Sequence, residues 1–160
     1  MSLGETFGAP YFVMEAVCIG PDGVEKWREI AHNTVVTAGK TDIIDKYFKG
    51  SAYTAAWKLG LKGAGSIVVG DTLSSHAGWS EVTPYSGNRP SITFGTTSGG
   101  SNTATAVSYS ITGTSTVAGA FVTDQASGTA GVLYSATDFA ASRSVASGDT
   151  LNVTLTVTAA

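Results

Sequence analysis

The chain has 160 residues and a mass of 16.2 kDa, a length that suits one domain with a core of its own, held without disulfides or structural metals. Charged residues make up only 13%, whereas 18 Ser, 22 Thr and 20 Gly fill 60 positions, which indicates short strands joined by small-residue turns and excludes a helical bundle. The net charge of −3 and the pI near 5.2 provide no basic surface for phosphates, so we expect no nucleic-acid partner.

Charge is distributed unevenly along the chain. Residues 1–63 carry seven acidic and seven basic side chains, whereas residues 64–160 carry five acidic and two basic ones. No Pro-rich or charged linker separates the two parts, so we predict a single domain over 1–160, with a charged front and Ser/Thr/Gly-rich strands behind it.

The sequence has neither the pattern of a signal peptide nor a run of about 18 apolar residues, so we expect synthesis in the cytoplasm and no membrane partner.

The first predicted element is a β-hairpin. Residues 11–19 are apolar on both faces apart from Glu15, as in a central strand, and Pro21-Asp22-Gly23 supplies turn chemistry before a second strand over 24–30. Cys18 lies in the first strand between Val17 and Ile19. It has no partner for an intramolecular disulfide, and we interpret it as a small core residue rather than a reactive thiol.

One short helix follows, near residues 38–49. Four apolar residues form a single stripe on it, and Gly50 stops it: Ile43, Ile44, Tyr47 and Phe48. We expect this helix to pack as a lid or crossover. The preceding segment 35–41 ends in Gly-Lys-Thr like a phosphate-binding loop, but Thr34 stands where that loop needs glycine, so no nucleotide cofactor is predicted.

The rest of the chain is predicted to be strands. Apolar residues alternate with polar ones in four segments, and three further segments are β-compatible: 57–61, 91–94, 107–111 and 151–157, then 119–123, 131–135 and 141–145. Eight to ten short strands and one helix insert predict a mainly β fold, an antiparallel β-sandwich or jelly roll, with a barrel as the alternative. Gly-Asp-Thr-Leu occurs at both 70–73 and 148–151, which indicates a repeated turn in which Asp bonds the backbone two residues on.

The sequence predicts no catalytic, metal or cofactor site. His32, His76 and Cys18 fall short of zinc-ligand spacing. His76 follows two serines, but no Gly-x-Ser-x-Gly elbow is present, and the Ser/Thr-rich part holds few carboxylates for acid–base work. We therefore predict that the protein is not an enzyme.

Aromatic residues suggest two kinds of binding surface. Five of them would suit a sugar-binding platform, although in a chain so poor in large side chains we favour the core for them: Trp27, Trp57, Trp79, Tyr53 and Tyr85. The loop 79–90 concentrates recognition-type side chains, and there we predict that Trp79, Tyr85 and Arg89 contact a partner. The alternative for Arg89 is that it ties down its own loop through Glu81 or a nearby carbonyl.

Four stretches carry a resemblance to a known class of proteins: residues 32–53, 57–63, 70–95 and 144–157. They resemble small β-rich structural proteins of tailed bacteriophages, described as head decoration (cement) proteins or tail-associated virion proteins. The resemblance implies a non-enzymatic homo-oligomer located in the virion, where it binds the major capsid protein or tail proteins. A tail-associated, receptor-binding or carbohydrate-binding β-domain is the alternative.

Overall fold

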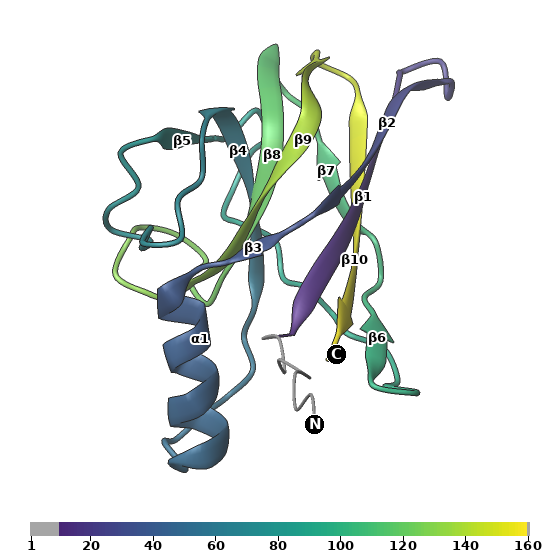
Figure 1. Cartoon of the computed structure of the whole chain (residues 1–160). Helices are drawn as coiled ribbons and strands as arrows, with labels where there is room; N and C mark the ends of the chain where they lie inside the picture. The colour runs from purple at the N-terminus through teal and green to yellow at the C-terminus, as the bar shows by residue number, and fades with distance from the viewer. Residues whose placement is uncertain (1–9, 160) are drawn as a thin grey trace, which may run out of the picture.

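Two antiparallel β-sheets pack face to face, and one short helical segment lies at one end of them (Figure 1). The computed structural model describes residues 10–159. The first sheet has the order β2-β1-β10-β6, with β7 pairing further along the same edge of β10, and the second has the order β3-β9-β8-β4-β5. This arrangement confirms the predicted antiparallel β-sandwich with one short helix.

The elements of the first sheet are β1 (Tyr11–Ile19), β2 (Glu25–His32), β6 (Ser101–Thr103), β7 (Val107–Ser110) and β10 (Thr150–Thr158). Those of the second are β3 (Thr34–Val35), β4 (Lys58–Gly65), β5 (Trp79–Val82), β8 (Ser115–Thr123) and β9 (Leu133–Val145). The helical segment consists of α1 (Thr37–Ile43) and the π-helical turn η1 (Ile44–Phe48).

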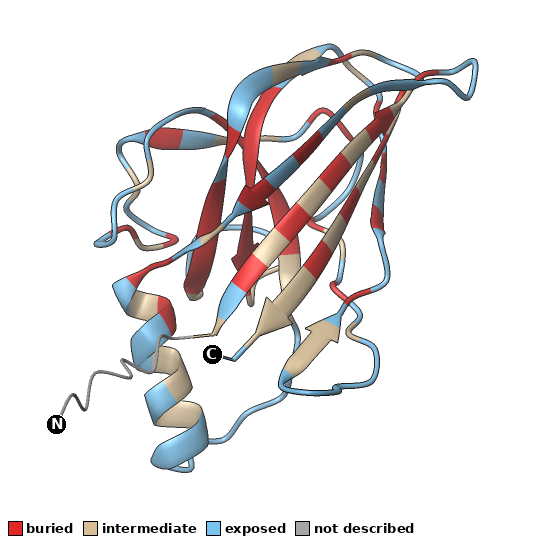
Figure 2. Ribbon diagram, turned by 45° about the vertical axis from the view of Figure 1, so that its right-hand side comes forward, coloured by how far each residue is buried: buried red, intermediate tan, exposed pale blue. Residues whose placement is uncertain are grey.

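The first sheet follows the predicted alternation. Leu151, Val153 and Leu155 of β10 are fully buried, while the residues between them are partly exposed. β1 pairs with β10 along its whole length and with β2 on its other side, so the predicted hairpin and the central position of β1 are confirmed. The alternating buried positions show as stripes along these strands in Figure 2.

The second sheet differs from the prediction in its longest strand. The segments 131–135 and 141–145, predicted as separate strands, contribute to one strand of 13 residues, β9. Its register against β8 shifts between Val117 and Gly119, and beyond that irregularity β9 is mostly exposed. The bulge allows one continuous strand to pass from a buried region to an exposed one. The hydrophobic periodicity of the sequence does not reveal this continuity.

The core consists of two clusters. Side chains from both sheets fill the space between them, and a smaller cluster around Trp79 and Phe121 lies on the other face of the second sheet. Leu73 and Ile67 from the loop 66–78 cover that smaller cluster. Loop residues therefore complete the hydrophobic core.

Residues 91–94, predicted as a strand, form only isolated bridges. Ser91 pairs with Lys58, whereas Phe94 pairs with Ala104. The predicted strand is therefore wrong, because successive residues of this segment bond to different neighbours and no continuous ladder develops.

The repeated Gly-Asp-Thr-Leu motif forms the same turn twice. The Asp71 carboxylate accepts a hydrogen bond from the Val68 amide at 3.0 Å, and Asp149 accepts one from the Ala146 amide at 2.8 Å. The repeated turn is confirmed, but each Asp bonds the amide three residues earlier rather than two residues later. Of the two glycines, only Gly148 has a positive φ, +92°.

The helical segment is attached to the sandwich mainly by its first turn. Gly39 is buried against β9, where a Cβ atom would overlap the Tyr134 carbonyl oxygen. From there α1 and η1 extend away from the sheets, at the lower left of Figure 1. Of the predicted apolar stripe, Ile43 is half-buried against the core, whereas Ile44, Tyr47 and Phe48 are exposed. Packing as a lid or crossover is therefore limited to the first turn and Ile43, and the rest of the apolar stripe is exposed.

Candidate functional site

The three residues predicted to contact a partner are buried. Trp79 is 5% exposed, Tyr85 9% and Arg89 7%. The Trp79 indole donates a hydrogen bond to Asp71 at 2.9 Å and stacks on His76, with 4.0 Å between the ring centroids. His76 thus covers a core tryptophan, as expected for a structural histidine.

Arg89 makes a complete set of contacts inside its own chain. Its guanidinium donates two hydrogen bonds to Glu81, at 2.8 and 2.7 Å, and two more to the carbonyls of Gln125 and Gly128. It also lies over the Phe121 ring, 5.3 Å from the centroid. These contacts favour the interpretation that Arg89 ties down its own loop. A partner contact by Trp79, Tyr85 or Arg89 stays a prediction.

Burial also determines the chemistry of two other groups named from the sequence. Burial, together with the nearby Asp149 carboxylate, raises the pKa of Cys18 to about 11, so this thiol is protonated at neutral pH. Burial likewise raises the pKa of Tyr85 to about 12. Neither group is an activated nucleophile or acid.

The five aromatic residues considered for a sugar-binding platform, and favoured for the core, are dispersed. Trp27 packs near Phe139, and Trp79 and Tyr85 lie in separate buried positions. Tyr53 and Trp57 alone are neighbours, with 6.4 Å between their ring centroids. These two line a cavity that the sequence did not predict.

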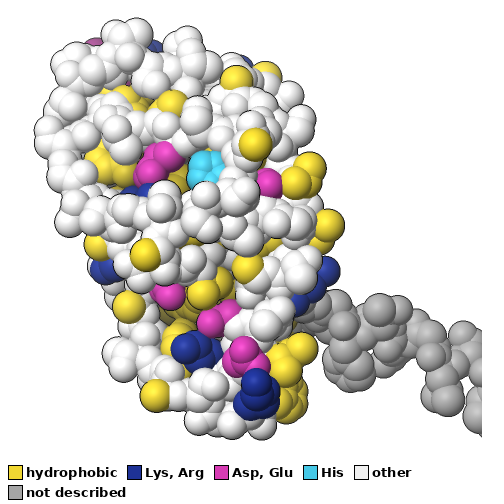
Figure 3. Space-filling model, turned by 90° about the vertical axis from the view of Figure 1, so that its left-hand side faces the viewer, with side chains coloured by type: hydrophobic (Ala, Val, Ile, Leu, Met, Phe, Trp, Pro, Cys, Tyr) yellow, Lys and Arg dark blue, Asp and Glu magenta, His cyan; other side chains and the backbone are white. Residues whose placement is uncertain are grey.

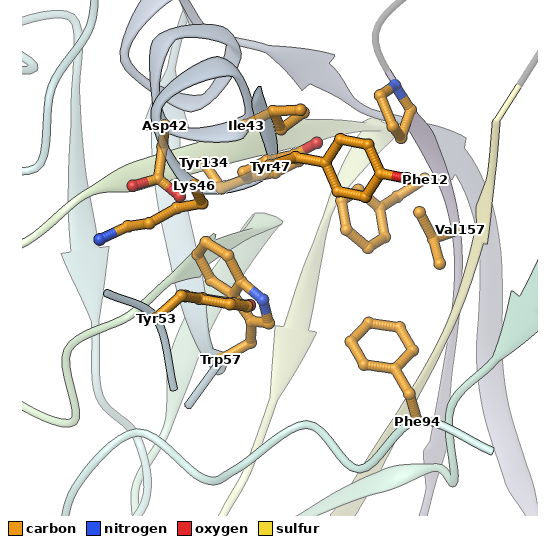
Figure 4. A pocket seen from close by; sticks show the side chains of 11 residues that line it. Phe12, Asp42, Ile43, Lys46, Tyr47, Tyr53, Trp57, Phe94, Tyr134 and Val157 are labelled. Atoms are coloured by element: carbon orange, nitrogen blue, oxygen red, sulfur yellow. The ribbon is translucent and has the colours of Figure 1, made fainter. Parts of the chain in front are cut away.

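This aromatic cavity has a volume of about 320 Å³ and opens where α1 and η1 meet the ends of β1 and β10 (Figure 4). It is lined by eleven residues, six of them aromatic: Pro10, Phe12, Asp42, Ile43, Lys46, Tyr47, Tyr53, Trp57, Phe94, Tyr134 and Val157. Tyr134 is its floor, in edge-on contact with Phe12 and Trp57 at centroid distances of 5.6 and 5.3 Å. Such edge-on packing holds the rings in fixed positions.

Two charged residues occupy the margin of the aromatic cavity. Burial raises the pKa of Asp42, and the nearby Asp124 adds to this effect, while Lys46 opposes it. The Lys46 ammonium donates to the Ala52 carbonyl at 3.3 Å and lies 6.0 Å from the Tyr53 ring centroid. The cavity is thus apolar inside, with one charge of each sign at its margin.

Beside the cavity, four large apolar side chains project into solvent. We call them the apolar helix face: Ile44, 54% exposed, Tyr47, 81%, Phe48, 74%, and Tyr53, 51%. Tyr47 and Tyr53 also line the cavity, so the face and the cavity are continuous. In the space-filling view of Figure 3, apolar, acidic and basic side chains alternate at the lower end, where the helical segment lies. Large exposed apolar side chains that adjoin a cavity are typical of interaction sites.

The sequence contained one signal for this surface. Ile43, Ile44, Tyr47 and Phe48 form an apolar stripe in the sequence, and such a stripe normally indicates a helix face that covers a core. No pattern in the sequence indicates that the helix contacts the sandwich at one end only.

Residues 10–159 hold no group of three or more His, Cys, Asp or Glu side chains placed to bind a metal ion. Among the same residues, no helix is both long and apolar enough to span a membrane. Comparison of the chain with protein-family models, curated proteins and solved structures found no match.

Proposed function

We propose that the protein is a non-enzymatic structural subunit of a tailed-bacteriophage virion, a capsid decoration protein that binds the capsid lattice as a homo-oligomer. The observation that carries the proposal is the apolar helix face, with Tyr47 and Phe48 about four-fifths and three-quarters exposed. Exposed aromatic side chains of this size are typical anchors of protein–protein contacts. The sequence resemblance to virion proteins indicates the kind of partner, a capsid lattice.

The β-sandwich supports the same role. Its surface is rich in Ser and Thr, as along β10, where Thr154 and Thr156 are half-buried on the outer face of the first sheet. Hydroxyl groups form hydrogen bonds across an interface at a lower desolvation cost than charges do. A sheet surface of this kind suits attachment to a large assembly.

The direct test is binding to capsids that lack this protein. Purified chain is mixed with such capsids, the particles are sedimented, and the bound copies are counted by quantitative mass spectrometry. Saturation at hundreds of copies per particle supports a decoration protein, whereas saturation at a few dozen copies on tails indicates a tail-associated protein. Absence from both particles, and from purified virions, contradicts the proposal.

A carbohydrate-binding or receptor-binding tail domain is the second candidate, and the aromatic cavity favours it. The exposed Tyr53 ring and the partly buried Trp57 ring offer flat apolar faces, and Asp42 and Lys46 provide polar groups at the margin. A mostly apolar pocket with a few polar groups is the usual form of a small-ligand site. A glycan array separates the candidates: binding that is lost in Trp57→Ala supports this one, and no binding at sub-millimolar concentration removes it.

A further inference from the structure

The apolar helix face and the aromatic cavity form a projection and a recess on one surface. Phe48 projects, and its ring packs edge-on against Tyr47, with 5.0 Å between the centroids. Tyr47 in turn lines the cavity. One aromatic side chain, Tyr47, therefore separates the exposed Phe48 ring from the recess.

A projection and a recess on the same patch meet the condition for a two-fold interface. In such an interface the same surface of both subunits is used, and each residue contact occurs twice. The cavity volume of about 320 Å³ exceeds the roughly 150 Å³ that admits a benzene ring in a protein interior. The cavity thus has room for a phenyl ring and part of its neighbour.

The charges around the patch also suit a second copy. Asp42, Asp45, Lys46 and Lys49 contribute two negative and two positive charges, with Asp45 paired to Lys49 at 3.0 Å. A partner with a strongly acidic or basic surface would gain little from this balanced set. A second copy carries the same balanced set, so a contact between two such patches joins surfaces without net charge and without net repulsion.

The exposed rings supply a large part of the area that a specific contact needs. The exposed parts of Tyr47, Phe48 and Tyr53 together amount to about two whole rings, or roughly 400 Å² per copy at about 200 Å² per ring. A standard interface buries about 800 Å² per partner, so these rings alone supply about half of it. The cavity lining and Ile44 extend the contact further.

The helical geometry at this point is unusual as well. The Lys49 amide donates to the Ile44 carbonyl at 3.1 Å, five residues back, in the π-helical turn η1. π-Helical turns are rare overall, and those that occur are often found at functional sites. Here the turn sets the directions of Tyr47 and Phe48.

From these observations we infer that two copies of the chain associate about a two-fold axis, with Phe48 of each copy inserted into the aromatic cavity of the other. The inference deepens the proposed function, on which it rests for the expectation of a homo-oligomer. It assigns the apolar helix face to contact between copies and leaves the sheet surfaces to contact the lattice.

The first test is sedimentation velocity of the purified chain over a range of micromolar concentrations. The wild type should form dimers, or higher even-numbered oligomers, and Phe48→Asp should raise the dissociation constant by about 30-fold or more, as expected for loss of an interface hot spot. Val24→Asp is the matched control, because Val24 is 60% exposed in the turn between β1 and β2, away from the patch. The control should associate like the wild type.

The second test locates the inserted ring. Phe48→Cys and Val157→Cys variants are mixed and oxidised, and heterodimeric disulfides between them should form far faster than with Val24→Cys. The native Cys18 is fully buried and does not compete. Formation of this cross-link also reports the contact in samples that dissociate on dilution.

Three outcomes would overturn the inference. One is a monomeric wild type that gives no cross-link; another is dimers unaffected by Phe48→Asp. The third is a monomeric wild type that dimerises only after residues 1–9 are removed, which would assign the cavity to the N-terminal segment of the same chain, since Pro10 lines it. A monomeric chain that still saturates capsids leaves the decoration role intact and rejects only the contact between copies.

Discussion

The loop 79–90 and the helical segment 37–48 place the same classes of side chain in opposite environments. In the loop, Trp79 and Arg89 are buried, although Trp and Arg are the residues most often found at interface hot spots. In the helical segment, Tyr47 and Phe48 are exposed, although their spacing is that of a core-facing stripe. Composition identifies residues able to bind a partner, but intramolecular contacts determine which of them are free to do so.

The difference lies in how many elements surround each region. Arg89 is met by Glu81 from its own loop and by two carbonyls from the loop between β8 and β9. The helical segment packs on β9 near Gly39, and beyond Ile43 its apolar residues have little to pack against. Charge reversal or truncation should therefore affect stability in the loop and association in the helical segment.

The largest effect on stability is expected at Arg89. Arg89→Ala removes both hydrogen bonds to Glu81, which is itself only partly exposed, and leaves two carbonyls without their donor. Truncating one partner of a buried ion pair costs about 3 to 5 kcal/mol, and we expect about 3 here because Glu81 regains some water. Urea denaturation of the variant and the wild type gives the difference in their free energies of unfolding, which measures this loss of stability.

Arg89→Lys provides the control for this prediction. Lysine keeps the charge but lacks the planar fork that bonds Glu81 and the two carbonyls together, so we expect an intermediate loss of stability. Association of the folded variants should match that of the wild type. A variant that folds with full stability but no longer associates would instead restore Arg89 as a partner-binding residue.

A second effect is expected where the helical segment meets the sandwich. Gly39→Ala places a Cβ atom against the Tyr134 backbone, which cannot yield as a side chain would, so α1 must shift away from β9. Overpacking of this kind costs about 1 to 3 kcal/mol. Because Tyr134 is also the floor of the aromatic cavity, association should weaken as well.

Lys40→Ala is the matched control, since Lys40 follows Gly39 in the helix and is exposed. It should leave both the unfolding free energy and the dissociation constant close to the wild-type values. If Gly39→Ala changed stability and left association untouched, the position of the helix would be irrelevant to the contact between copies.

Acid titration extends the comparison to a second buried charge, Asp149. Burial raises the pKa of Asp149, but hydrogen bonds from Lys26 and the Ala146 amide outweigh burial and hold that pKa below its ordinary value. The carboxylate therefore stabilises the folded state fully above the ordinary pKa of aspartate, and this stabilisation is lost as pH falls through the lowered value.

The expected result is a pH-dependent gap between wild type and Asp149→Asn. Near pH 6 the wild type should unfold at higher urea concentration, and the gap should narrow as pH falls below about 4. Contributions of the other carboxylates cancel in the comparison. If the difference in stability between wild type and Asp149→Asn stayed constant down to pH 2.5, the charge of Asp149 would contribute nothing to stability beyond the shape of its side chain.

The strands could be predicted where one face is buried. In β10, Leu151 and Val153 alternate with polar residues, and the period of two is sufficient to assign both the strand and its inward face. The segment 91–94 shows the same alternation but lacks a single neighbouring strand, and β9 runs through a region where no regular pattern is visible. Pairing between distant segments determined both outcomes, and a local pattern does not contain it.

The candidate site was predicted only in part, for a related reason. Tyr53 and Trp57 are among the aromatic residues considered for a platform, although the sequence favours the core for them. Phe12 and Phe94 come from distant segments and have the pattern of ordinary strand residues. The cavity exists because the fold brings these segments together at the end of the sandwich. Their convergence depends on the sheet topology, which cannot be deduced from composition or spacing.

The smallest effect on stability is expected where the surface is most apolar. Phe48→Ser removes a large ring that is 74% exposed, so little apolar area returns to water when the monomer unfolds, and we expect the unfolding free energy to change by less than about 0.5 kcal/mol. Ile43→Ser, one helical turn away, removes a half-buried side chain that packs on the core, and it should destabilise the chain measurably. Both variants are compared at low concentration, where the chain is monomeric, because association adds stability by mass action. As the concentration rises, the wild type should gain stability and Phe48→Ser should not. If Phe48→Ser lost as much stability as Ile43→Ser in the monomer, Phe48 would belong to the core, and the contrast between the loop and the helical segment would fail.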